Sequence, residues 1–126
     1  MPSWSTLCKQ ADTVIAATKA SLPPQVRSVA DPIPVVYYPA PTPDMIADGI
    51  EPDLLGLFLG PDLPGRLDDA TFDPLPTEIL LFLDNILDYS EDDLPTFREE
   101  VRLTYLHELG HLLGLDELDL TARDLD

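Results

Sequence analysis

Cysteine and long apolar runs are both scarce in this chain of 126 residues, and each shortage excludes something. The one cysteine, Cys8, cannot form an intramolecular disulfide, so the sequence gives no sign of an oxidising compartment. Uninterrupted apolar stretches are far shorter than the roughly 18 residues that span a bilayer, so no membrane-spanning helix is expected. No secretory signal is visible among the first residues, and we therefore expect a cytoplasmic protein.

Basic residues are also few, with 7 Lys and Arg against 24 Asp and Glu, which gives a net charge of −17. A charge of this sign repels phosphate backbones and anionic membrane surfaces, so neither nucleic acid nor a membrane is expected as a partner. The acidic field serves solubility, and it also attracts cations and basic peptides. A divalent metal ion would be held more easily in such a field.

The length predicts one compact domain over residues 1–126, and the pattern of apolar residues predicts a mixture of helices and strands. Residues 5–22 read as an amphipathic helix that Ser3 or Ser5 caps and that Pro23 and Pro24 end. Seven prolines between Pro23 and Pro43 exclude a long helix there.

Three short apolar segments are candidate strands: residues 33–38, 54–60 and 77–83. In the second, Gly56 would allow another part of the chain to approach closely. The third would end at Asp84 and Asn85, although a helix through Ile86 and Leu87 is the competing interpretation, because apolar runs of this length are ambiguous.

A long helix is expected from about Leu94 to Leu113, with a cap between Ser90 and Asp93. The two histidines of the chain, His107 and His111, lie four positions apart near its end. Positions four apart share one helix face, about 6 Å along the axis, so both imidazoles can reach one metal ion.

Zinc accepts imidazole and carboxylate ligands, and a catalytic zinc site keeps three protein ligands and one position for water. Glu108, between the histidines, is then a candidate general base that takes a proton from the water and passes it to the leaving amine. Gly114 just after the helix can turn the chain back towards the metal. Glu117 is the candidate third ligand, with Asp116 and Asp119 as competitors.

A structural explanation competes with each of these roles. Two buried core histidines beside an unpaired glutamate would be costly on an apolar helix, so we prefer a metal site to this alternative. The acidic residues after Gly114 are equally compatible with a solvent-exposed surface that binds no metal. Cys8 is a weak candidate ligand, and a small half-buried core thiol is the preferred interpretation.

The run from His107 to Gly114 resembles the small bacterial zincin-like family of predicted minimal zinc metallopeptidases. Residues 54–60 and 80–83 support the resemblance by their order and spacing, and the similarity extends from about Leu22 to Leu120. The resemblance implies a zincin-like α+β fold, in which a small mixed sheet packs on an N-terminal helix and on the long helix that carries the motif.

The same resemblance implies that His107 and His111 are metal ligands, that Glu108 is the base, and that an acidic residue stands at Glu117. A peptide substrate would lie extended along the strand near Leu54 to Gly60 and pair with its backbone. The chain departs from better understood zincins in having Glu117 where a third histidine ends their motif.

The leading functional hypothesis is zinc-dependent peptide-bond hydrolysis by an endopeptidase. The alternative is a non-catalytic metal-binding or protein-interaction module that retains the site. A metal-dependent ribonuclease is a third hypothesis, and both the charge of −17 and the lack of a third histidine oppose it.

Overall fold

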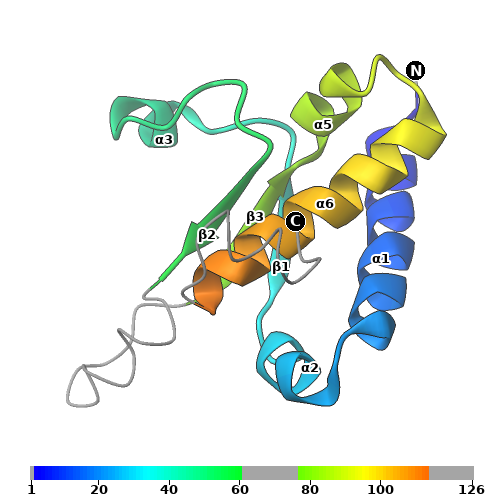
Figure 1. Ribbon diagram of the computed structural model, residues 1–126. Helices are drawn as coiled ribbons and strands as arrows, with labels where there is room; N and C mark the ends of the chain where they lie inside the picture. The colour runs from blue at the N-terminus through cyan, green and yellow to red at the C-terminus, as the bar shows by residue number, and fades with distance from the viewer. Residues whose placement is uncertain (1, 61–76, 114–126) are drawn as a thin grey trace.

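The described residues 2–60 and 77–113 of the computed structural model form helices and short strands (Figure 1). The elements are, in order, α1 (Trp4–Ser21), α2 (Pro24–Ala30), β1 (Val35–Tyr38), α3 (Pro43–Ala47), β2 (Gly56–Leu59), β3 (Glu78–Phe82), α5 (Leu83–Tyr89) and α6 (Leu94–Leu112). No helix in these ranges is long and apolar enough to cross a membrane.

The three described strands form one mixed sheet in the order β1-β3-β2. β1 runs parallel to β3, with Val36 opposite Leu80, whereas β2 runs antiparallel to β3, with Leu57 opposite Leu80. β3 is therefore the central strand, and its residues from Ile79 to Phe82 are fully buried. β2 is an edge strand, and its outer side is free of strand pairing among the described residues.

Helix α6 lies against β2 and β3 and passes diagonally in front of the sheet, and α1 packs on α6 (Figure 1). Buried side chains from α1, β3 and α6 form a single apolar cluster, which includes Leu7 and Ile15 of α1, Leu81 of β3, and Phe97 and Tyr105 of α6. Two polar contacts orient α1. Arg98 donates to the Gln10 side chain at 3.1 Å, and the Tyr37 hydroxyl donates to the Asp12 carboxylate at 2.6 Å.

Most of the predicted elements are confirmed. The first helix begins at Trp4, and Ser3 rather than Ser5 caps it by accepting from the Thr6 N–H. The three strands lie inside the predicted segments, and α6 occupies nearly the whole predicted range. Its cap is Asp93, whose side chain accepts from the Thr96 N–H.

The predicted end of the third strand at Asp84 and Asn85 is wrong. β3 ends at Phe82 and the chain continues directly into α5, so strand and helix both exist, one after the other. The Asp84 and Asn85 N–H groups donate to the Pro39 carbonyl at 3.1 and 3.4 Å, which ties the start of α5 to the end of β1. This long-range contact is absent from the local pattern that suggested a strand end.

Two short helices, α2 and α3, were missed in the proline-rich segment. Each begins with a proline at its first position, Pro24 and Pro43, where the missing N–H costs nothing and the fixed φ favours a helical turn. The prolines do exclude a long helix here, as predicted. The fold as a whole is the expected zincin-like α+β fold, with a small mixed sheet packed on two helices.

Candidate metal centre

The last two turns of α6 present His107 and His111 on one face of a helix whose second half is otherwise mostly buried. The two rings lie edge to face, with centroids 4.7 Å apart. His107 is half-buried and His111 is exposed, whereas the residues around them from Thr104 to Leu112 are buried. The sequence predicted this arrangement, in which only the motif faces outward from the second half of the helix.

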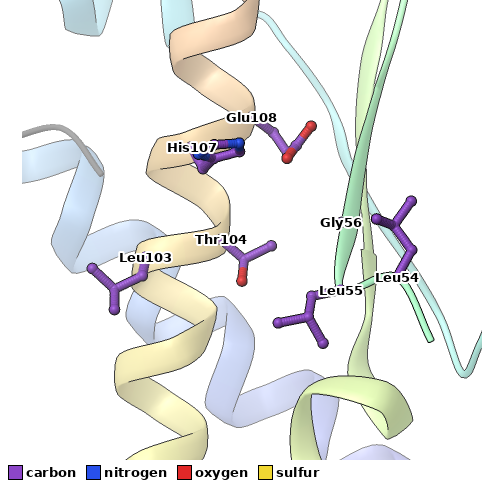
Figure 2. Close-up of a pocket in the computed structure, with 7 residues that line it drawn as sticks. All are labelled: Leu54, Leu55, Gly56, Leu103, Thr104, His107 and Glu108. Carbon is purple, nitrogen blue, oxygen red and sulfur yellow. The ribbon is translucent and has the colours of Figure 1, made fainter. Parts of the chain in front are cut away.

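Glu108 lies on the side of α6 that faces β2, and only 8% of it is exposed. Its carboxylate points from the helix towards the strand (Figure 2), and it accepts a hydrogen bond from the Phe58 backbone N–H. Burial raises the pKa of Glu108 above the ordinary value, although the neighbouring His111 and the Phe58 N–H both oppose that rise. A carboxylate in this environment is a stronger base than an exposed one.

The donor atoms of His107, Glu108 and His111 all lie within 4.8 Å of one another. Ligands about 2.1 Å from one zinc ion are at most about 4.2 Å apart, so the imidazoles are within a small side-chain adjustment of sharing an ion. Two imidazoles beside a carboxylate are also the donor types that zinc prefers. The residues present therefore fit a zinc ion held by His107 and His111.

Close packing between α6 and β2 depends on Gly56. A Cβ atom at this position would lie 2.5 Å from Cγ2 of Thr104 and 3.4 Å from Cγ of Glu108. Non-bonded carbon atoms do not approach to 2.5 Å, so a side chain at position 56 would force either Thr104 or the spacing between α6 and β2 to change. The sequence predicted that another part of the chain approaches Gly56 closely, and that part is α6.

Two cavities lie along the boundary between β2 and α6, and Glu108 lines both. The first, which we call the His107 cavity, has a volume of about 500 Å³ (Figure 2) and is lined by Leu54, Leu55, Gly56, Leu103, Thr104, His107 and Glu108. The second, the His111 cavity, measures about 420 Å³ and is lined by Leu57, Phe58, Gly60, Glu108 and His111. The candidate base therefore forms part of the wall of both cavities.

The backbone of β2 has one side turned away from the sheet. The Phe82 N–H donates to the Leu55 carbonyl at 2.9 Å, and because hydrogen-bonding direction alternates in antiparallel strands, Gly56 and Phe58 direct their N–H and C=O groups outward. The bond from the Phe58 N–H to Glu108 agrees with this direction. The outer edge of β2 is thus adjacent to the candidate base.

Asn85 of α5 holds the segment that enters β2. Its side-chain amide donates to the carbonyls of Pro52 and Leu54 at 2.8 and 2.9 Å. Leu54 is one wall of the His107 cavity, so this amide helps to shape the cavity from outside it. Sequence reasoning missed this role because nothing local connects Asn85 with residues 52–54.

The predicted third ligand, Glu117, lies outside the described residues. The same is true of its competitors Asp116 and Asp119 and of Gly114. Cys8 lies on α1, half-buried beside the apolar cluster, and is not part of the one group of potential ligands found in the described ranges. Burial, followed by the nearby Asp12, raises the pKa of its thiol. These observations fit a core thiol better than a ligand.

A mixed sheet whose antiparallel edge strand flanks a helix with a His-Glu-x-x-His motif is the arrangement of a zincin-like protein. The model of the zincin-like metallopeptidase family matches residues 30–126, and the chain belongs to this family. No curated protein is similar enough to count as a match. Membership of the family implies a metal ion, usually zinc, and a peptidase as the general class of protein.

Proposed function

We propose that this protein is a zinc-dependent endopeptidase in which Glu108 is the general base. The observation that carries the proposal is the position of Glu108, buried beside the two histidines and shared by the His107 and His111 cavities. A substrate that occupied both cavities would extend past the base on either side. This is what cleavage within a chain requires, whereas removal of a terminal residue needs a groove closed at one end.

The chemistry divides between the metal and the protein. A zinc ion held by His107 and His111 would supply a Lewis acid and would lower the pKa of a water bound to it towards about 7. Glu108, whose pKa is raised by burial, accepts the proton of the attacking water and later passes it to the leaving amine. Only 8% of Glu108 is exposed, so its carboxylate interacts more strongly with nearby charges than an exposed one would.

We further propose that the peptide binds as an extended strand beside β2, near residues 54–60. The outward carbonyl of Phe58 and the outward N–H and carbonyl of Gly56 would pair with the peptide backbone. Pairing of this kind is independent of the peptide's side chains. The net charge of −17 favours basic peptides in the first encounter.

Glu117 is our proposed third ligand, because it is a carboxylate a few residues beyond the motif helix. Zinc affinity measured for Glu117→Gln, Asp116→Asn and Asp119→Asn tests this assignment. We expect a loss of tenfold or more in Glu117→Gln alone. An equal loss in Asp116→Asn or Asp119→Asn, with Glu117→Gln unchanged, would move the role to that residue.

The decisive experiment compares wild type with Glu108→Gln on a diverse peptide library, with zinc content measured on the same samples. We expect both proteins to hold one zinc and the variant to lose activity by about 10²–10⁴-fold, the usual contribution of a general base. Glu99→Gln, an exposed position on the same helix, is the matched control and should retain activity. Zinc binding without cleavage of any peptide by wild type would instead favour a non-catalytic module.

A further inference from the structure

The two cavities beside Glu108 differ in the side chains that form their walls. In the His107 cavity three leucines, Leu54, Leu55 and Leu103, surround the space, and Gly56 and Thr104 form its remaining apolar surface. Leu55 and Thr104 point into the gap between β2 and α6 (Figure 2). The polar groups of this cavity, His107 and Glu108, are those of the candidate metal centre.

We propose that the His107 cavity binds a large apolar side chain of the peptide substrate, such as Leu, Met or Phe, next to the cleaved bond. Leu103 and Leu55 would set the size of that side chain. This inference rests on the proposed function, since it names the substrate preference of the same groove. The volume of about 500 Å³ leaves room for a side chain of this size together with the adjoining peptide backbone.

The lining residues also determine what the cavity rejects. An acidic side chain would lose its hydration there and would be repelled by the carboxylate of Glu108. A small side chain such as that of Ala would leave the leucine walls unfilled. Each missing methylene in an apolar pocket typically costs about 10–200-fold in kcat/KM, so Leu should be cleaved much faster than Ala.

The absence of a side chain at Gly56 keeps the cavity in this shape. Thr104 lines the cavity and already occupies the space that a Cβ at position 56 would need, with 2.5 Å between them. A larger residue at position 56 would therefore require Thr104, part of the cavity wall, to shift. The close packing of β2 on α6 and the capacity of the cavity are two consequences of the same glycine.

The test measures kcat/KM on peptides that differ only at the residue next to the cleaved bond, as Leu, Phe, Ala, Asp or Lys. Wild type should prefer Leu over Ala and Asp by at least tenfold. Leu103→Ala should shift the preference towards Phe, and Leu103→Phe should shift it towards Ala. Ile46→Ala is the control, because Ile46 lies on α3, is 42% exposed and lines neither cavity.

Binding to zinc-loaded Glu108→Gln gives a second measurement that does not need turnover. Calorimetry with the same peptides should show the Leu peptide binding at least tenfold more tightly than the Asp peptide. Cleavage with no preference at this position, a preference for Lys, or a preference that both Leu103 variants leave unchanged would overturn this inference alone. Selective binding of the Leu peptide without cleavage by wild type would support the cavity and overturn the proposed endopeptidase.

Discussion

Thr104 of the motif helix packs directly over Gly56 of the edge strand, so that a Cβ on Gly56 would lie 2.5 Å from the Thr104 methyl carbon. This contact joins two segments that are far apart in the sequence and brings Glu108, one turn beyond Thr104, to the backbone of β2. Glu108 can therefore lie against β2 because position 56 carries no side chain.

Gly56→Ala should therefore destabilise the protein, by about 1–3 kcal/mol as is usual for overpacked sites. Thr104→Ser removes the methyl group that the new Cβ would meet, so the double variant should recover part of the loss. Urea denaturation of the two single variants and the double variant measures the coupling. Strictly additive losses would show that Thr104 is not the group that opposes a side chain at position 56.

Asn85→Ala should loosen the wall of the His107 cavity without affecting the metal ligands. Loss of the two bonds to the Pro52 and Leu54 carbonyls should cost about 1–3 kcal/mol. We expect KM for peptides to rise while zinc affinity stays at the wild-type value. Asp84→Ala, the exposed neighbour on α5, is the matched control. A loss of zinc in Asn85→Ala would mean that this amide supports the metal centre instead.

Zinc affinity should depend on His107 and His111 and not on Cys8. His107→Ala and His111→Ala each remove one of two imidazole ligands, and we expect each to lower affinity by at least a hundredfold. Cys8→Ser should bind zinc as wild type does, because Cys8 lies on α1 outside the group of potential ligands. Competition with a zinc chelator provides the measurement. Unchanged affinity in both histidine variants would refute the proposed site.

Alkaline pH should destabilise the fold through Tyr37. Burial and the hydrogen bond to Asp12 raise the pKa of Tyr37 in the folded protein, whereas the unfolded chain has an ordinary value of about 10. Above pH ~10 the unfolded state loses this proton first, so the free energy of unfolding falls as pH rises. Burial raises the pKa of Tyr105 to about 12, which adds to the fall between pH ~10 and ~12.

Tyr37→Phe removes the first of these contributions, so its free energy of unfolding should depend less steeply on pH above ~10. Chemical denaturation at a series of pH values from 8 to 11 compares the two proteins. Tyr89→Phe is the control, because Tyr89 is 65% exposed and should behave as wild type. Identical pH dependence in wild type and Tyr37→Phe would show that the pKa of Tyr37 is the same in the folded and unfolded protein.

Local geometry explains which features could be predicted without the structure. The helix that carries His107 and His111, its start near Asp93 and the three strands all follow from short-range spacing, apolar periodicity and capping residues. Errors arose where a distant contact decided the outcome. The turn from β3 directly into α5 depends on the Pro39 carbonyl, which no local pattern contains.

The sequence by itself determined that two imidazoles and a glutamate share one end of a helix, because positions four apart always lie on one face. The roles of His107, His111, Glu108 and Glu117, the cytoplasmic location and the single domain over residues 1–126 stay predictions. Only the tertiary structure decided that Glu108 is buried against β2 and lines two cavities. Packing between distant segments sets burial and cavity shape, and it depends on how the whole core is filled.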